Sequence, residues 1–266
     1  MNKILGFSAV IIMIAAMGYI VVSYQHIASQ AREEGQTTRK NKNTTTQNTT
    51  APKTKSSKKN SAIPNAQPTD WNLILVGPEH RLEQEVDEST QLVSLPNGYL
   101  IDKRIQRDYE DLAKAAQNSG FPLVMVSAYR SVSSQQEVFA QNVQEVMSSQ
   151  NVSEEEATAI TKQTITEPGY SEHHTGLAVD VVDENWYNNY PSQLLDASYG
   201  GQPGAKWIAE NASKYGFIVR YPKDRQAVTK ITYEPWHLRY VGKENAEYIT
   251  QHNITLEEYL DQLKKK

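Results

Sequence analysis

The amino-acid composition of the chain changes twice along its length, and these changes confine any globular fold to the last part of the chain. Residues 4–24 contain no charged side chain and are mostly apolar. Residues 30–66 are almost free of apolar side chains and consist largely of Thr, Asn, Lys and Ser. Only the remainder has enough apolar residues to bury a hydrophobic core, and its length fits one domain. We therefore predict an N-terminal segment over residues 1–29, a tether over residues 30–68 and a folded domain over residues 69–266.

The first apolar run is long enough to cross a membrane. Residues 4–24 form an uncharged run of 21 residues, and a bilayer core requires about 20. Lys3 on the short flank predicts that the N-terminus stays in the cytoplasm. The alternative is a cleaved signal peptide with small residues near Ala28 or Ala31, but no A-x-A pattern follows the run. We predict one transmembrane helix that anchors the chain in the cytoplasmic membrane, and both interpretations export the rest.

The composition of the next segment predicts a disordered, basic tether. Residues 30–66 hold eight basic residues against two acidic ones, and so few apolar side chains do not offset the entropy of ordering the chain. The segment is either a solvated spacer or a basic strand attracted to anionic wall polymers or lipid headgroups. Residues 67–266 hold 18 basic residues against 29 acidic ones. We therefore expect no nucleic-acid partner for the domain.

The absence of cysteine limits the chemistry that the chain can perform. It excludes disulfides, thiolate metal ligands and a cysteine nucleophile. Any metal site must use His, Asp or Glu. The six histidines are His26, His80, His173, His174, His237 and His252. The local sequence around His26, His80 and His252 indicates surface residues, which leaves the other three as candidate ligands.

The order of the expected secondary structure indicates an α+β fold. Helical spacing of apolar residues or capping patterns predict helices over residues 104–119, 134–148, 153–164 and 205–215, and a last helix that begins near residue 255. Apolar runs predict strands over residues 121–128, 176–182, 217–221 and 234–240, and a strand or an extended surface segment over residues 71–76. No regular βαβ alternation is present. We predict a small, mostly antiparallel sheet flanked by helices.

One stretch, SEHHTGLAVD, places an acidic residue at the end of an apolar run. Asp180 ends the run GLAVD, and a carboxylate on a buried strand is costly unless it is paired or bound to a cation. His173 lies seven residues earlier, and an unbroken strand would point the two side chains to opposite faces. Gly176 permits a sharp turn between them. Adjacent side chains diverge, so we expect His174 to line the cleft or to be exposed and not to bind the same metal.

A second stretch, YEPWHLRYVG, adds another histidine and another carboxylate. Glu234 and His237 are three residues apart with Pro235 between them, which differs from the helical H-E-x-x-H pattern of metalloproteases. An extended segment with a kink at Pro235 would direct both side chains into one cleft. Each residue taken alone is more typical of a packing residue or a surface charge, but together with the first stretch they predict a catalytic metal site.

The two stretches also carry a family resemblance. The S-x-H-x-x-G-x-A-x-D pattern is formed by Ser171, His173, Gly176, Ala178 and Asp180, and the downstream E-x-x-H pattern by Glu234 and His237. Residues 70–250 resemble the zinc peptidases that group lysostaphin, D-Ala-D-Ala peptidases and the hedgehog signalling domain. The stretches WNLILV, SAYRS and EPWHLRYVG are most similar to the VanY-like carboxypeptidases of bacterial cell walls. Ala128 stands where the family often has glycine, a mild change in a turn.

The resemblance implies a fold like that of hedgehog and the D-Ala-D-Ala peptidases, with a bound Zn²⁺. Its implied ligands are His173, Asp180 and His237, and Glu234 is the implied general base. Zinc lowers the pKa of a bound water to about 7, which supplies a nucleophile for amide hydrolysis.

The resemblance also implies how the substrate is held. Arg130 would stabilise the charge that develops on the scissile carbonyl oxygen, because its guanidinium is planar and permanently charged. Gln135 and Ser171 would help to hold the C-terminal end of the substrate. The implied substrate is a peptidoglycan stem peptide.

These observations predict a membrane-anchored, monomeric zinc carboxypeptidase with its catalytic domain on the extracellular, cell-wall side. It removes C-terminal D-alanine from stem peptides that end in D-Ala-D-Ala. An L,D-carboxypeptidase acting on the tetrapeptide is an alternative, and residues 183–204 are where the two specificities would differ. An endopeptidase that cuts cross-links and a non-catalytic zinc-containing binding module are further alternatives, and the presence of Glu234 favours an enzyme over the latter.

Overall fold

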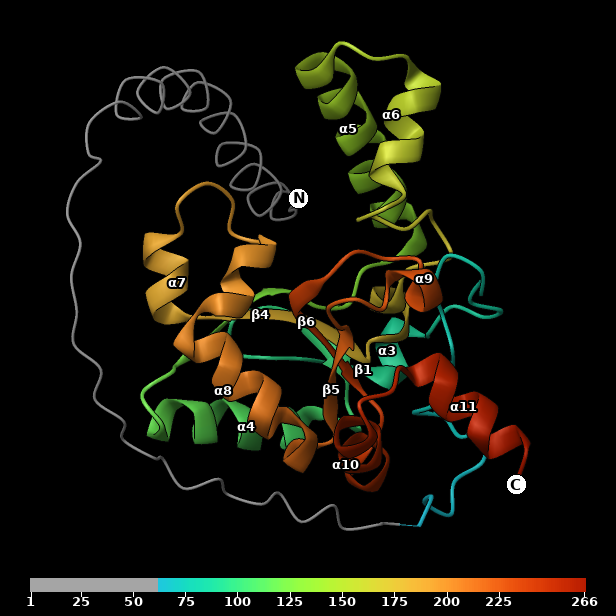
Figure 1. The fold of residues 1–266 in the computed structure, drawn as a ribbon, viewed down its shortest axis with the longest axis vertical. Helices are drawn as coiled ribbons and strands as arrows, with labels where there is room; N and C mark the ends of the chain where they lie inside the picture. The colour runs from blue at the N-terminus through green and yellow to red at the C-terminus, as the bar shows by residue number, and fades with distance from the viewer. Residues whose placement is uncertain (1–61) are drawn as a thin grey trace, which may run out of the picture. The chain divides into compact units, whose positions relative to one another are not determined.

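A four-stranded sheet lies at the centre of residues 62–266, the part of the chain that the computed structural model describes (Figure 1). Its strands, in spatial order, are β3 (Leu123–Ser127), β4 (Ala178–Asp183), β6 (Glu234–Tyr240) and β5 (Phe217–Tyr221). Each neighbouring pair is antiparallel. The predicted α+β class with an antiparallel sheet is therefore confirmed, and all four predicted central strands are present.

The remaining elements surround this sheet. A two-stranded hairpin is formed by β1 (Leu92–Ser94) and β2 (Leu100–Asp102). The helices are α3 (Glu88–Gln91), α4 (Gln106–Asn118), α5 (Val132–Gln150), α6 (Glu154–Thr161), α7 (Glu184–Asn189), α8 (Pro203–Asn211), α9 (Gln226–Thr229), α10 (Lys243–His252) and α11 (Leu256–Lys264). Short 3₁₀ helices are η2 (Glu172–Thr175), η3 (Ala197–Gly201) and η4 (Ala212–Tyr215). The hairpin and helices α3, α7, α9 and α10 were not predicted.

The predicted membrane anchor and most of the predicted tether lie outside the described residues. The compact unit begins at Ala62, and Ile63 and Ala66, which the sequence had placed in the tether, pack against a hydrophobic cluster of the domain. Within residues 62–266, the helices are too short or too polar to cross a membrane.

Local sequence explains where the helices begin. The side chain of Ser153 accepts a hydrogen bond from the backbone of Glu156, and the Glu156 carboxylate accepts one from the Ser153 backbone, which forms the predicted capping box of α6. Thr255 and Glu258 form the same box at α11. Helices α5 and α6 pack against each other and extend away from the sheet as a hairpin (Figure 1). This hairpin has its own small hydrophobic cluster, which includes Val143.

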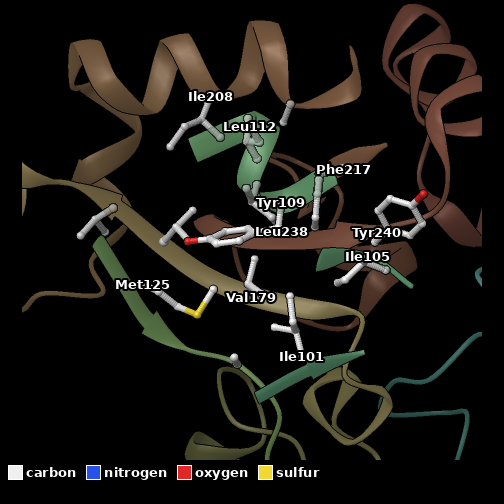
Figure 2. Close-up of a cluster of buried hydrophobic side chains, with 14 of the residues drawn as sticks. Ile101, Ile105, Tyr109, Leu112, Met125, Val179, Ile208, Phe217, Leu238 and Tyr240 are labelled. Carbon is white, nitrogen blue, oxygen red and sulfur yellow. The ribbon is translucent and has the colours of Figure 1, made fainter. Parts of the chain in front are cut away.

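The main hydrophobic core lies between the sheet and helices α4 and α8 (Figure 2). Val179 of β4 and Leu238 of β6 are register partners and are both fully buried. They meet Leu112 of α4 and Ile208 of α8 in one cluster. Since side chains alternate along a strand, burial of Val179 on this face turns Asp180 to the other face.

The segment over residues 71–76 forms no strand, since residues 71–72 lie in a turn and residues 73–76 have no regular secondary structure. Leu73 is fully buried and belongs to a second cluster with residues of α10 and α11. The Arg239 guanidinium donates to the carbonyl oxygens of Asn72 and Ile74 at 3.2 and 2.7 Å. These hydrogen bonds satisfy carbonyls that would otherwise need a neighbouring strand.

The two outer pairings of the sheet each contain an irregularity, and both lie beside the predicted site. Between β5 and β6, Val219 pairs with Leu238 but Tyr221 pairs with Glu234. Strand β6 therefore has two more residues than β5 in this interval. The extra residues contain Pro235, where we predicted a kink, and bulges of this kind redirect side chains. A second shift lies between Met125 and Ser127 of β3.

Gly176 forms the sharp turn that links η2 to β4. Its φ of 68° lies in the left-handed region, and its carbonyl accepts a hydrogen bond from the Asp102 amide at 2.9 Å. A Cβ atom at this position would lie 2.8 Å from a methyl group of Leu92 and 3.0 Å from the Asp102 backbone nitrogen. The turn therefore requires glycine for its backbone conformation and for the close approach of β2.

We expect Gly176→Ala to destabilise the domain more than Gly98→Ala does. Gly98 has a similar φ of 87°, but a Cβ atom added there would have no neighbour within 4 Å, so alanine incurs only the left-handed penalty of about 1–2 kcal/mol. At Gly176 the contact with β2 should add at least about 1 kcal/mol. Urea denaturation followed by tryptophan fluorescence gives both free energies of unfolding. Equal losses would show that the approach of β2 imposes no constraint on this turn.

Candidate metal centre and active site

Three side chains that are distant in sequence converge to form a candidate metal centre. His173 comes from η2, Asp180 from β4 and His237 from β6. All three are buried, and one potential ligand atom of each lies within 4.8 Å of the others. Asp180 and His237 are direct register partners across β4 and β6. The predicted turn at Gly176 brings His173 beside them, with its Nε2 3.3 Å from Asp180 Oδ2.

In His173 and His237, the ring nitrogen that faces away from Asp180 contacts an oxygen atom outside the candidate metal centre. His173 Nδ1 lies 2.8 Å from the carbonyl oxygen of Ala128, and therefore donates its proton there. His237 Nε2 lies 3.3 Å from Glu172 Oε2, and its Nδ1 lies 3.1 Å from Asp180 Oδ1. Each ring thus turns one nitrogen towards the Asp180 carboxylate and anchors the other, as metal-binding histidines do.

The donor set fits a zinc ion. Two imidazoles and one carboxylate are a common ligand set for catalytic zinc, which keeps a further position open for water. Asp180 Oδ1 is buried, and although His237 Nδ1 lies 3.1 Å away, no hydrogen bond of acceptable geometry reaches this oxygen from the described residues. An orphaned carboxylate oxygen of this kind is costly unless a cation binds it. Asp180, His173 and His237 are therefore the residues that would hold the ion.

The charges of this cluster favour cation binding. Burial by itself raises the pKa of the Asp180 carboxyl, but the rings of His173 and His237 hold it well below its usual range. Burial lowers the pKa of His173. Burial by itself also lowers the pKa of His237, but the carboxylates of Asp180 and Glu172 beside its ring raise it to about 10. A metal ion that binds His237 must therefore displace a proton.

Glu234 lies beside the cluster but is not needed as a ligand. Its Oε2 is 3.6 Å from His237 Nδ1, because the irregular start of β6 directs both side chains to the same side. Burial raises the pKa of the Glu234 carboxyl to about 8, and the nearby Asp180 and Glu172 carboxylates act in the same direction. A bound cation would favour the ionised form instead. Such a carboxylate can exchange a proton with a water molecule near neutral pH.

Arg130 is held in a fixed orientation at the start of α5. Its Nη1 donates to Gln135 Oε1 and its Nη2 to Ser127 Oγ, both at 2.8 Å. Gln135 is buried, and its Nε2 donates to the Thr166 carbonyl oxygen at 2.7 Å. Both ends of the Gln135 amide are thus engaged within the protein. Gln135 therefore helps to orient Arg130, and its predicted contact with the C-terminal end of the substrate stays a prediction.

Ser171 and His174 stabilise the loop that carries His173. Ser171 caps η2, since its Oγ accepts from the His173 amide at 3.3 Å. His174 Nε2 accepts from the Gly169 amide at 3.0 Å, and its Nδ1 lies 2.6 Å from the Arg130 carbonyl oxygen. The expectation that His174 lines the cleft or is exposed is wrong, because the residue is buried and both ring nitrogens have partners.

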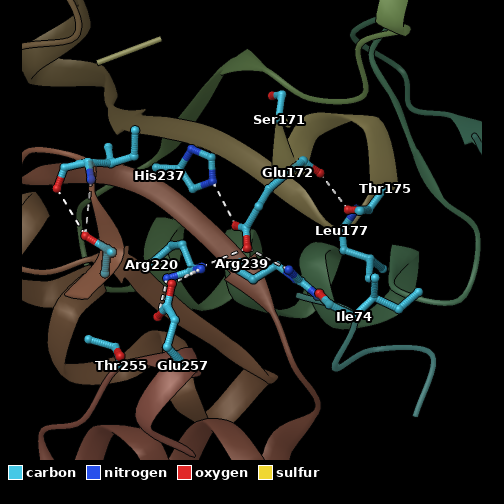
Figure 3. A network of polar contacts seen from close by, with 12 residues as sticks. Ile74, Ser171, Glu172, Thr175, Leu177, Arg220, His237, Arg239, Thr255 and Glu257 are labelled. Carbon is cyan, nitrogen blue, oxygen red and sulfur yellow. Dashed lines mark hydrogen bonds and ion pairs between the residues drawn. The ribbon is translucent and has the colours of Figure 1, made fainter. Parts of the chain in front are cut away.

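Glu172 was missed by the sequence analysis. It is buried between Arg220 of β5 and Arg239 of β6 and contacts His237 (Figure 3). Burial by itself raises the pKa of the Glu172 carboxyl, but the two guanidinium groups hold it well below its usual range. A signal was available in the sequence, because FIVRY and WHLRY each place an arginine in an apolar strand. A buried arginine requires an acidic partner.

Known proteins share this sequence and this fold. Residues 98–243 match the family described as VanY: D-alanyl-D-alanine carboxypeptidase. A D-alanyl-D-alanine carboxypeptidase of Enterococcus faecalis is 35% identical over 192 residues, which are 72% of this chain and 66% of that protein. The bifunctional D-Ala-D-Ala dipeptidase and carboxypeptidase VanXYC of Enterococcus gallinarum is 31% identical over 194 residues, 72% of this chain and 94% of that one.

Solved structures extend the likeness to three dimensions. The vancomycin-resistance D,D-pentapeptidase VanY in complex with Zn(II) superposes with a TM-score of 0.62 at 34% identity, covering 72% of this chain and 99% of that one. VanYB in complex with D-alanine-D-alanine gives a TM-score of 0.63 at 35% identity, with coverages of 72% and 98%. The LD-carboxypeptidase LdcB gives 0.60 at 33% identity, with coverages of 73% and 87%.

The comparisons agree with the geometry of the site. The family match spans the metal centre and Glu234, and a neighbour of the same fold was solved with zinc. The chain is therefore a zinc-dependent carboxypeptidase, and it belongs to the VanY family of D-alanyl-D-alanine carboxypeptidases.

Proposed function

We propose that this domain removes the C-terminal D-alanine from peptidoglycan stem peptides that end in D-Ala-D-Ala. The observation that carries the proposal is the buried cluster of His173, Asp180 and His237 with a separate carboxylate, Glu234, beside it. The relatives named as D-alanyl-D-alanine carboxypeptidases and the neighbour solved with D-alanine-D-alanine support the choice of substrate.

Glu234 is the residue best placed to transfer the proton. Zinc, when bound, lowers the pKa of a water molecule to about 7 and polarises the scissile carbonyl. Glu234 accepts the proton of the attacking water and then delivers it to the amine of the leaving D-alanine. Its burial keeps bulk water away from the proton that it carries. Asp180 and the two histidines, which serve as ligands, take no part in this transfer.

Arg130 recognises the negative charge of the substrate. Hydrogen bonds to Gln135 and Ser127 fix the orientation of its guanidinium, so the group needs little reorganisation when a carboxylate or a developing oxyanion arrives. A planar guanidinium pairs well with either oxygen group. Ser171 Oγ accepts from the His173 amide, and the His173 carbonyl oxygen accepts from the Arg130 amide at 3.2 Å. We propose that Ser171 lies along the C-terminal end of the substrate.

An L,D-carboxypeptidase is the second candidate, favoured by the likeness to LdcB. Both activities release the same terminal D-alanine, so the metal centre and Arg130 serve either reaction. The two differ in the residue before the cut, which is D-alanine in one case and an L-residue in the other. Residues 183–204 include α7 and η3, and we propose that this region contacts that preceding residue.

We further propose that residues 1–29 anchor a monomeric enzyme in the cytoplasmic membrane, with residues 62–266 on the extracellular side. The support is the uncharged run over residues 4–24 and the location of the substrate in the cell wall. The basic segment that follows would let the domain reach its substrate away from the membrane surface.

Glu234→Ala should abolish turnover without removing the metal. Loss of a general base lowers the rate by about 10²–10⁴-fold, and Glu234 is not among the three ligands. Release of D-alanine from a synthetic stem pentapeptide measures the rate, and elemental analysis measures bound zinc. The tetrapeptide, assayed in parallel, separates D,D from L,D activity. Failure of the zinc-loaded wild type to release D-alanine from either peptide would contradict the proposal.

His173→Ala and His174→Ala should separate the two adjacent histidines. His173→Ala removes a ligand, and we expect zinc to be lost together with activity. His174→Ala removes hydrogen bonds to Gly169 and Arg130, so it should lower thermal stability and the rate but retain stoichiometric zinc. Elemental analysis after dialysis gives the metal content of both variants. Equal zinc loss would show that the metal centre is assigned incorrectly.

A further inference from the structure

We propose that Glu172 is a positioning residue that fixes the His237 ring so that Nδ1 faces the metal. This inference rests on the proposed function, because it assumes a zinc ion held by His237. The observation that carries the inference is the contact between Glu172 Oε2 and His237 Nε2, at 3.3 Å. Glu172 accepts the Nε2 proton, and the lone pair of the neutral ring is thereby left on Nδ1, the nitrogen that faces Asp180.

The two histidines of the site are anchored by different groups. His173 donates to a neutral acceptor, the Ala128 carbonyl oxygen. His237 instead contacts a carboxylate, which is a stronger acceptor and increases the basicity of the ring. Without that contact, the acceptors on the Nδ1 side, Asp180 and Glu234, would favour a proton on Nδ1. A proton there excludes the metal from His237.

Two buried arginines hold Glu172 in place and in its charged form. Glu172 Oε1 accepts from Arg220 Nε and from Arg239 Nη1, both at 2.7 Å (Figure 3). The side chains of all three residues are fully buried. Glu172 Oε1 thus accepts hydrogen bonds from the two arginines, and Oε2 contacts His237, so the two oxygens of the carboxylate have different partners.

Each arginine is in turn tied to a distant part of the chain. Arg220 makes a two-pronged contact with Glu257 of α11, at 2.7 and 3.0 Å. Arg239 donates to the backbone carbonyls of Asn72 and Ile74, in the segment over residues 71–76. Glu172 therefore has little freedom to move, and its contact with Nε2 fixes the orientation of the His237 ring.

Glu172→Gln tests this arrangement, with Glu257→Gln as the matched control. Each variant removes one of the two carboxylates bonded to Arg220 and preserves side-chain size. Only Glu172→Gln changes the partner of His237. Because the arginines require an acceptor, the oxygen of the new amide would face them and its NH₂ group would face His237 Nε2. The ring would then carry its proton on Nδ1, where the metal binds.

We expect Glu172→Gln to weaken zinc binding by about 10–100-fold, the usual effect of losing the partner of a metal-binding histidine. Glu257→Gln should stay within about threefold of wild type. Competition with a chromophoric chelator measures the affinity of the full-length protein, and thermal unfolding of the metal-free form shows whether the two variants are similarly destabilised. Equal zinc affinities for the two variants would overturn the proposal.

A measurement on the wild type covers the case in which Glu172→Gln does not fold. Nitrogen-15 NMR of the histidine rings in the zinc-loaded protein should show His237 with its proton on Nε2 and His173 with its proton on Nδ1. A proton on Nδ1 of His237 would overturn the inference. D-alanine release is assayed separately, so a protein that binds zinc as described but releases no D-alanine would contradict the proposed function alone.

Discussion

The structure depends on keeping negative charge buried beside two histidines. Asp180, Glu172 and Glu234 lie together under one face of the sheet and are all buried. An unpaired buried carboxylate is strongly unfavourable. Each of the three carboxylates offsets this cost in a different way. Glu172 pairs with two arginines, and Asp180 contacts the imidazole rings and would bind the ion that they hold. The pKa of the Glu234 carboxyl is raised, which favours its neutral form. These differences agree with the proposed roles of the three carboxylates: Glu172 in positioning His237, Asp180 in metal ligation and Glu234 in proton transfer.

The fold supplies this charge arrangement through backbone geometry. Direct pairing of β4 with β6 places Asp180 opposite His237. The irregular pairing of β5 with β6 then directs Glu234 to the same side. Both departures from regular strand pairing lie within a few residues of the site, where bulges commonly re-aim functional side chains. The core on the other face, built on Val179 and Leu238, fixes the strands that carry these groups.

The sequence predicted the convergence of the three candidate ligands, because the spacing of their motifs contains the relevant information. The turn at Gly176 and the kink near Pro235 are local features, so the convergence of His173, Asp180 and His237 could be inferred from short motifs. The supporting residues could not be found in this way. Glu172 meets Arg220 and Arg239 at separations of 48 and 67 residues, and only tertiary structure determines which buried arginine pairs with which acid. The short hairpin β1–β2 was missed because strands of three residues have too little periodicity to detect.

Neighbouring residues of the 3₁₀ helix η2 support two different parts of the site, the candidate metal centre and Arg130. Glu172 contacts Nε2 of the His237 ring, the nitrogen that faces away from the candidate metal position. His174 joins the Arg130 carbonyl to the Gly169 amide, and thereby fixes the backbone that carries the Arg130 guanidinium. His173, between them, faces Asp180. A single tight turn thus sets the position of the metal relative to Arg130. Because hydrogen bonds tie this turn to the backbone of Arg130, the distance between the candidate metal position and the guanidinium is better preserved than it would be without them.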